Sequence, residues 1–217
     1  MPLFQDRTDA GQRLAQKLTD YQGRTDVVVL GLPRGGVPVA FAVAHVLNAP
    51  LDVFLVRKLG LPGHEELAMG AIASGGVRVL NREVIDGLRI PPEVIDAVAR
   101  REQQELERRE QAYRDHRPPP GLRNQIVILV DDGLATGASM AAAVAGLRAQ
   151  SPAQIIVAVP IAAPETCEVF ENKVDRVVCA ETPQPFFGVG LWYGDFAQVR
   201  DEEVSELLAR SANRSAA

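Results

Sequence analysis

Residues 126–139 read IVILVDDGLATGAS, an apolar run that ends in two adjacent carboxylates and continues into small and hydroxyl residues. The first five residues are β-branched or aliphatic and show no alternation, which is typical of a strand covered on both faces. Asp131 and Asp132 repel each other, and burial raises the cost of their charge, so they need donors or cations. This strand end is therefore expected to bind a ligand.

The residues that follow the acid pair have the features of an anion site. Thr136, Gly137, Ala138 and Ser139 stand where the next helix is expected to begin. Backbone N–H groups at a helix start bind anions, and two hydroxyls add donors. Vicinal sugar hydroxyls, or a hydrated metal, would satisfy the carboxylates. The segment therefore fits a sugar phosphate.

Similar apolar runs recur along the chain, at 27–30, 51–56, 155–159 and 177–180. Helical patterns lie between them, at 37–47 and 139–149. Strands that alternate with helices predict an α/β fold with a mostly parallel central sheet flanked by helices.

Two further helices are expected outside this pattern. Ala10, Leu14, Leu18 and Tyr21 recur at helical spacing, with Thr8 or Asp9 as the N-cap. Residues 92–117 form a long helix that PPPG ends, with the favourable pairs Glu105–Arg109 and Glu110–Arg114. Apolar residues are scarce in its second half. A mostly solvated helix is expected, with a dimer or partner surface as the alternative.

Composition excludes several classes of protein. The chain has 217 residues, 47% of them hydrophobic and 24% charged, so it can bury a core without needing disulfides or metal ions for stability. A net charge of −5 argues against a general nucleic-acid or acidic-membrane surface. The two cysteines lack metal-ligand spacing; Cys179 is expected to be a buried thiol, and so few cysteines fit a reducing compartment. No signal peptide or membrane span is evident, which predicts a cytoplasmic protein.

Other acidic strand ends do not fit. The haloacid dehalogenase pattern needs Asp-x-Asp, and a response-regulator receiver needs a lysine well downstream, whereas Lys173 is the last lysine. Neither GK[ST] nor GxGxxG occurs, so P-loop and dinucleotide fingerprints are missing.

The segment VILVDDGLATGAS (127–139) closely resembles the PRPP-binding motif of type I phosphoribosyltransferases. The resemblance implies that family's fold, with a small hood formed from the chain ends. It also implies that Asp131 and Asp132 contact the ribose hydroxyls. The 5′-phosphate would be enclosed by Ala135, Thr136, Gly137, Ala138 and Ser139. One departure is Gly133, where the family usually has an aliphatic residue.

A second loop supports the resemblance. In VVVLGLPRGGVPVA (27–40), two glycines allow backbone to approach an anion and Arg34 offers a bidentate fork for phosphate oxygens. A plain Gly-rich turn is the alternative. Arg34, Gly35 and Gly36 resemble the pyrophosphate loop of xanthine-type members, which implies a non-proline cis peptide near Pro33–Arg34.

A third loop, FLVRKLGLPGHEELAMGAIASGG (54–76), would be the lid. Arg57 and Lys58 resemble the basic pair before the flexible catalytic loop of orotate-type members, and would bind pyrophosphate. Glycines and Pro62 interrupt regular structure, as a mobile lid would. His64, Glu65 and Glu66 are possible proton acceptors, or simply solvated residues. The segment is shorter than most lids of the family.

The acceptor base would sit beneath the aromatic stretch ETPQPFFGVGLWYGDF (181–196). By a loose resemblance to hypoxanthine–guanine and xanthine members, Phe187 and Asp195 would frame a purine-like base, with Trp192 as a rival stacking residue. An aromatic core cluster is the alternative. The lysine that reads the purine oxo group in those enzymes has no clear match; Lys173 is closest but displaced.

The resemblance implies one domain over 1–217, with its core at 25–180, the hood at 181–210 and a disordered tail at 211–217. The implied activity transfers 5-phosphoribosyl from PRPP to a nitrogenous base and releases pyrophosphate, with Arg34, Lys58, Asp131 and Asp132 as catalytic residues. Mg²⁺ would be carried by PRPP near the aspartates rather than bound directly, and a homodimer is expected.

Rival interpretations share this motif. The main alternative is a non-catalytic PRPP or nucleotide sensor on the same fold. PRPP synthases need an ATP site and a longer chain. A structural protein with a vestigial site is the third interpretation.

Overall fold

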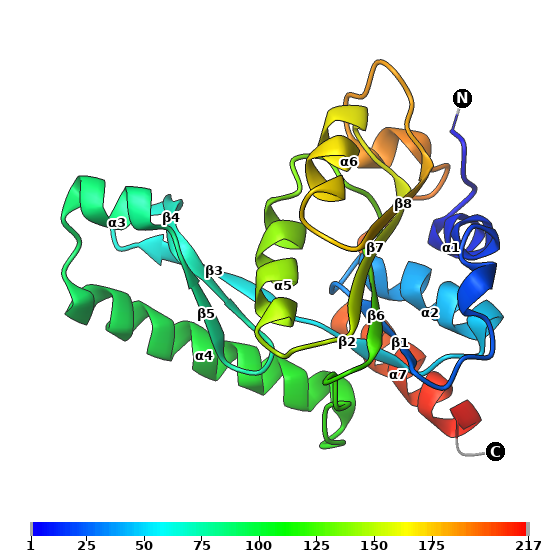
Figure 1. Ribbon diagram of the computed structural model, residues 1–217, viewed down its shortest axis with the longest axis horizontal. Coiled ribbons are helices and arrows are strands. Elements are labelled where there is room, and N and C mark those ends of the chain that lie inside the picture. The colour runs from blue at the N-terminus through cyan, green and yellow to red at the C-terminus, as the bar shows by residue number, and fades with distance from the viewer. Residues whose placement is uncertain (1, 216–217) are drawn as a thin grey trace.

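Five parallel strands form the central sheet, in the order β2-β1-β6-β7-β8, and a second, antiparallel sheet has the order β3-β4-β5 (Figure 1). The computed structural model describes residues 2–215, and the predicted α/β architecture is confirmed. The elements are α1 (Arg7–Gln16), a 3₁₀ turn (Thr19–Tyr21), β1 (Val27–Gly31), α2 (Gly36–Leu47), β2 (Leu51–Val53), β3 (Val56–Leu61), β4 (His64–Ala73), β5 (Val77–Leu80), α3 (Arg82–Leu88), α4 (Pro92–Arg114), β6 (Ile126–Val130), α5 (Ala138–Arg148), β7 (Gln154–Ile161), α6 (Pro164–Glu171), β8 (Arg176–Glu181), a second 3₁₀ turn (Val189–Trp192) and α7 (Asp201–Ser215).

Helices cover both faces of the central sheet (Figure 1). On β1, Val28 and Leu30 pack in a cluster with α5 and α6, whereas Val27 and Val29 pack with α1 and α2. Successive side chains of a strand point to opposite faces, so every β1 residue is buried. This two-sided burial explains the absence of alternation in the apolar runs.

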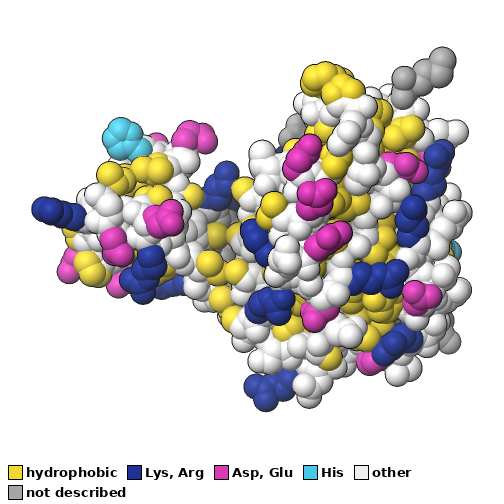
Figure 2. Space-filling model, turned by 45° about the horizontal axis from the view of Figure 1, so that its top comes forward, with side chains coloured by type: hydrophobic (Ala, Val, Ile, Leu, Met, Phe, Trp, Pro, Cys, Tyr) yellow, Lys and Arg dark blue, Asp and Glu magenta, His cyan; other side chains and the backbone are white. Residues whose placement is uncertain are grey.

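An arm made of residues 56–114 (β3, β4, β5, α3 and α4) projects from one edge of the central sheet (Figure 1). In the space-filling view it is a narrower lobe beside the larger body (Figure 2). The apolar run 51–56 is divided, because β2 ends at Val53 and β3 belongs to the second sheet. The predicted irregular lid is instead a β3–β4 hairpin that turns at Pro62 and Gly63.

The long helix α4 is not mostly solvated, which corrects that expectation. Its Ile95, Val98 and Leu106 are buried against the antiparallel sheet and α7. The predicted pair Glu105–Arg109 forms at 2.7 Å. The scarcity of apolar residues misled because α4 also buries charged side chains in ion pairs.

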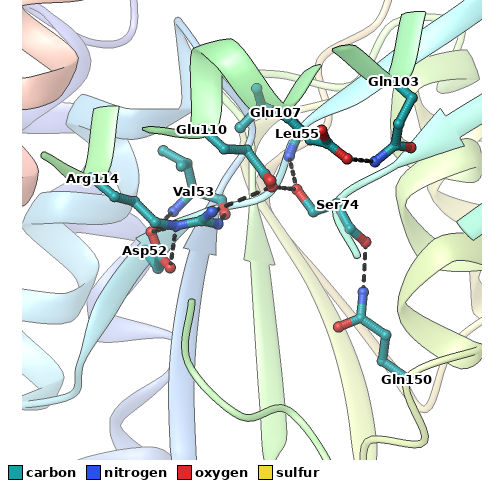
Figure 3. A network of polar contacts seen from close by, with 9 residues as sticks. All are labelled: Asp52, Val53, Leu55, Ser74, Gln103, Glu107, Glu110, Arg114 and Gln150. Carbon is teal, nitrogen blue, oxygen red and sulfur yellow. Dashed lines mark hydrogen bonds and ion pairs between the residues drawn. The ribbon is translucent and has the colours of Figure 1, made fainter. Parts of the chain in front are cut away.

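A buried polar network fastens the arm to the sheet (Figure 3). Arg114 of α4 donates from Nε to both carboxylate oxygens of Asp52 on β2, at 3.0 and 2.9 Å. Its Nη1 lies 3.4 Å from Glu110 Oε1, which also accepts from the Ser74 hydroxyl at 2.5 Å. The same hydroxyl accepts from the Leu55 N–H at 2.8 Å. Helix α4 therefore holds the segment that enters the arm, at Asp52, and the end of β4, where Ser74 also binds Leu55.

Removal of Arg114 should destabilise the protein strongly. Burial raises the pKa of Asp52 even against the attraction of Arg114, so Arg114→Met would leave a buried carboxylate without its counter-ion. We expect a loss of about 3–5 kcal/mol in unfolding free energy, measured by urea denaturation. Asp52→Asn in the same chain should recover much of the loss. The exposed pair Arg24–Asp26 is the matched control, and Arg24→Met should leave the urea midpoint of unfolding unchanged. Equal urea midpoints for Arg114→Met and the parent chain would refute the prediction.

The two ends of the described chain differ from expectation. Asp6 caps α1, accepting from the Thr8 N–H at 2.8 Å and the Asp9 N–H at 2.9 Å, so the predicted caps lie inside the helix. The predicted disordered tail is wrong for 211–215, where α7 continues. Arg214 holds this turn by donating to the His45 carbonyl at 3.0 Å. Residues 216–217 lie outside the described residues.

The two cysteines of the chain are bonded to each other. Cys167 of α6 and Cys179 of β8 form a disulfide, which corrects the expectation of a free buried thiol. The twelve-residue separation gave no sign of it, because only the fold brings α6 against β8. Across residues 2–215, no helix is both long and apolar enough to cross a bilayer.

Candidate active site

Two loops meet at the carboxyl edge of the sheet because their strands, β1 and β6, are neighbours in register. Gly31, the last residue of β1, is paired with Val130, the last of β6. The Leu32 N–H then donates to the Val130 carbonyl at 2.9 Å. The Pro33–Arg34 peptide is cis, as predicted. The glycine loop therefore lies beside the two aspartates.

The two glycines of this loop are in close contact with the acid pair. A Cβ on Gly35 would lie 2.0 Å from Asp132 Oδ2, and one on Gly36 would lie 2.8 Å from the Cα of Asp131. Gly35 has φ −61°, which any residue adopts. Space, and not backbone freedom, therefore requires glycine at position 35.

Each aspartate has one oxygen engaged by the protein. Asp131 Oδ1 accepts from the Asp132 N–H at 2.9 Å. Asp132 Oδ2 accepts from Arg7 Nε, also at 2.9 Å. Within residues 2–215, the other oxygen of each carboxylate accepts no hydrogen bond. The pair thus offers two acceptor atoms, one from each residue, for neighbouring donors on a ligand.

The electrostatics of the pair favour a ligand that supplies donors or positive charge. Burial, followed by the repulsion from Asp132, raises the pKa of Asp131 well above its ordinary value. Burial also raises the pKa of Asp132, while the Arg7 guanidinium opposes the rise. Because strongly perturbed carboxylates concentrate at functional sites, this pair is the main candidate for chemistry.

The loop after the acid pair opens the N-terminus of α5 to solvent. Leu134 anchors it, donating to the Ile161 carbonyl at 2.9 Å. Gly137 takes a left-handed conformation, φ +72°, and a Cβ there would lie 2.6 Å from the Phe170 ring. The other four residues of the predicted phosphate site are exposed: Ala135, Thr136, Ala138 and Ser139. Among the described residues, no side chain caps α5, so its first N–H groups are open to an anion.

The basic residues predicted to bind pyrophosphate are only partly brought together. Arg34 leads from the glycine loop, and its Nη1 lies 4.0 Å from Asp201 Oδ1. Arg57 instead faces α4 and binds Glu102, with Nε 2.6 Å from Oε2. Lys58 is exposed, and strand alternation puts it on the opposite face of the hairpin, the face from which Val56 packs toward α5.

The predicted base-binding residues lie in a hood, defined here as residues 3–7 and 186–197. The Phe4 and Gly194 backbones are hydrogen-bonded there, Gly194 N–H to Phe4 carbonyl at 2.8 Å. Trp192 packs inward with Phe4, as the core-cluster alternative expected. Phe187 is 79% exposed, and Asp195 accepts from a backbone N–H within the hood. Helix α7, which was assigned to the hood, packs on α2 and α4 instead.

Two residues that touch the acid pair had not been predicted. Arg7 reaches Asp132 across 125 positions of sequence, and the Tyr193 hydroxyl donates to the Asp132 carbonyl at 2.5 Å. Tyr193 lies within the aromatic stretch already singled out. Arg7 stands in an ordinary polar helix start, and no local pattern marks it.

Gly133, the departure from the motif, has a packing role. A Cβ on Gly133 would lie 2.4 Å from Val189 Cγ1 and 3.0 Å from Ile161 Cγ2. Val189 belongs to the hood. Because Gly133 has no side chain, Val189 of the hood can pack directly against the turn that follows the two aspartates.

Restoring an aliphatic residue here should displace the hood. We expect Gly133→Val to cost about 1–3 kcal/mol of stability through overpacking. It should also raise KM for the acceptor more than it changes PRPP binding. Val189→Ala added to Gly133→Val makes room and should recover both quantities, as thermal melts and initial rates would show. Unchanged acceptor KM in the single variant would contradict the proposed contact.

The residues present fit a metal that arrives with its ligand. Within the described residues, no group of three or more His, Cys, Asp or Glu side chains could hold a metal ion. Mg²⁺ takes six oxygen ligands and keeps several waters, so the two unengaged oxygens of Asp131 and Asp132 could only add to a shell supplied mostly by phosphates and water.

Comparisons with known proteins agree with this geometry. Residues 63–193 match the family model described as phosphoribosyl transferase domain. Two Mycobacterium tuberculosis proteins, MT0597 (strain CDC 1551) and Rv0571c (strain H37Rv), named as candidate phosphoribosyl transferases, are each 49% identical over 97% of this chain. The chain spans 47% of the length of each. The crystal structure of TT1426 from Thermus thermophilus is 43% identical, with a TM-score of 0.83 over 97% of this chain and 99% of that one. The chain belongs to the phosphoribosyl transferase family.

Proposed function

We propose that the protein transfers the 5-phosphoribosyl group of PRPP to a nitrogen atom of a heterocyclic base and releases pyrophosphate. The observation that carries the proposal is the pair of unengaged oxygens on Asp131 and Asp132, beside an uncapped helix start and the Arg34 loop. Together they match a ribose diol flanked by a phosphate and a pyrophosphate.

Asp131 and Asp132 hold the ribose ring. The 2′- and 3′-hydroxyls are vicinal donors, and each carboxylate offers one oxygen to them. The N–H groups at the start of α5, with Thr136 and Ser139, take the 5′-phosphate. Ring and phosphate are thus fixed by one continuous stretch of chain.

The leaving group lies over the glycine loop. Arg34 and the backbone of Gly35 and Gly36 receive the charge of the departing pyrophosphate, and exposed Lys58 of β3 is the further basic residue assigned to it. Asp131 and Asp132 would lie near a Mg²⁺ ion carried by PRPP, and the ion would supply positive charge that offsets part of the charge of the leaving group. Arg57 is left out of this set because Glu102 already binds it.

The reaction is a displacement at C1 of the ribose. A lone pair on the acceptor nitrogen forms the new bond to C1, and the electron pair of the breaking C1–O bond leaves with pyrophosphate. Positive charge develops on the ring, close to the negative carboxylates of Asp131 and Asp132. Holding both reactants in line supplies much of the remaining rate enhancement.

The hood covers the acceptor. Phe187 is free to stack on a flat ring because its side chain is largely exposed. Trp192 packs inside the hood, and exposed Asp195 is the acidic residue assigned to the base. A purine-like base fits this aromatic lining and is the first class to test.

Calorimetric titration of PRPP, with and without Mg²⁺, tests the site. Saturable binding that needs Mg²⁺ is expected, followed by pyrophosphate release when purines and other nitrogenous bases are supplied one at a time. Binding without turnover with any base would favour the sensor alternative. Absence of PRPP binding in the presence of Mg²⁺ would refute the proposal.

A further inference from the structure

We propose that Arg7 is a positioning residue that orients the Asp132 carboxylate and couples the hood to the ribose site. This inference rests on the proposed function, because it assigns Asp132 to the ribose. It concerns a residue far from every sequence motif of the site.

Arg7 is held at three points. Its Nε donates to Asp132 Oδ2 at 2.9 Å, and its Nη1 donates to the Ala197 carbonyl at 2.8 Å. The guanidinium carbon lies 3.9 Å from the centre of the Phe196 ring. The side chain is 12% exposed. A planar group with two hydrogen bonds and a stacked ring has one orientation, and it imposes that orientation on its partner.

The partner is the carboxylate on which the ribose would depend. Asp132 Oδ2 lies between Arg7 and Gly35, where there is no room even for a methyl group. With Oδ2 fixed there, Oδ1 is the oxygen left for a ligand. Without Arg7 the carboxylate could rotate, and its charge would face Asp131 unopposed.

Arg7 also belongs to the hood. Phe196, on which it stacks, lies 4.9 Å from the Tyr193 ring centre to centre. Tyr193 in turn donates from its hydroxyl to the backbone carbonyl of Asp132. The side chain and the backbone of Asp132 are therefore both bound by hood residues. A shift of the hood would move the carboxylate, so acceptor binding and ribose alignment are linked.

A double-mutant cycle tests whether Arg7 acts through Asp132. Arg7→Gln keeps a hydrogen-bond donor but removes the charge. We expect the PRPP Kd to rise and kcat to fall, each about 10- to 100-fold, because a misplacement of about 1 Å costs up to about 100-fold. KM for the acceptor should rise as well. Arg7→Lys keeps the charge without the fork and should be intermediate.

In an Asp132→Asn chain, the further Arg7→Gln change should alter Kd and kcat by less than about threefold, because both changes remove one interaction. Arg24→Gln, which breaks an exposed arginine–aspartate pair, should leave both constants unchanged. Multiplicative losses in the double variant, or Arg7→Gln constants within about twofold of the parent, would overturn the proposal.

Hydrogen–deuterium exchange without PRPP separates this inference from the proposed function. Arg7→Gln should raise uptake jointly in 131–137 and 189–197, compared with the parent chain and Arg24→Gln. If the parent chain binds no PRPP, the proposed function fails, but the deuterium uptake still tests whether Arg7 couples the two segments. Unchanged uptake in both segments overturns the coupling.

Discussion

Gly35→Ala is expected to lower kcat/KM for PRPP by at least about 100-fold, because the added methyl carbon would stand 2.0 Å from Asp132 Oδ2. No atom can remain at that distance. Either the carboxylate turns away from the ribose or the pyrophosphate loop lifts, and both displace groups that the reaction needs. Initial rates with saturating acceptor measure the loss, and circular dichroism checks the fold.

The matched control is Gly87→Ala in α3. Apart from its chain neighbours and the backbone of its own helix, a Cβ there would meet no atom of the described residues within 4 Å, and alanine favours a helix over glycine by about 1 kcal/mol. Normal kinetics with equal or higher stability are expected for it. If Gly35→Ala behaved like Gly87→Ala, the contact between loop and carboxylate would have no role in PRPP binding.

Asp131→Asn should weaken PRPP binding about 10- to 100-fold, since it removes a charged acceptor from a ribose hydroxyl. The same change should raise the melting temperature at neutral pH. Asparagine keeps an oxygen for the Asp132 N–H and removes a carboxylate that burial and its neighbour disfavour. Loss of binding with a gain in stability is the signature of a group kept for function.

The pH dependence of stability tests independently whether ionisation of Asp131 destabilises the folded state. The pKa of Asp131 is raised in the folded state, so between its unfolded and folded values the folded state binds more protons. Stability of the parent chain should therefore fall as pH rises through the carboxyl range, and this component should be absent in Asp131→Asn. Melting curves from pH 4 upward measure this pH dependence. For the PRPP-binding measurement, the control variant is Asp26→Asn, which lies at an exposed ion pair. A parent-minus-variant difference independent of pH would contradict the assigned burial.

The site was predictable where its parts are contiguous in sequence. Strand β6, the acid pair and the start of α5 follow one another without interruption, so spacing alone placed the aspartates at a strand end and Thr136 at a helix start. The loop at Arg34 could be joined to them because parallel strands present their carboxyl ends on one edge.

The predictions from sequence were wrong where a glycine can mark either a flexible loop or a close packing contact, and where a charged residue can be either solvated or buried in an ion pair. Gly60 suggested a flexible lid, yet a Cβ on Gly60 would lie 2.6 Å from the Glu65 carbonyl oxygen of the neighbouring strand. This glycine allows the two strands of the hairpin to approach. The charged face of α4 suggested solvent, yet Glu102 and Arg114 are buried by partners on other elements. Arg7 could not be found at all, since its partner is distant in sequence.

The hood depends on contacts between residues 3–7 and 186–197, which lie far apart in the sequence, and this affects when it can form. Arg7 and Ala197 are 190 positions apart, so closing this contact is entropically costly unless the sheet has already brought the ends together. The parallel core should therefore fold first, and the hood should dock last and open first. Local opening of this kind would let an acceptor enter and a product leave, and closing the hood would restore the Arg7 contact that orients Asp132.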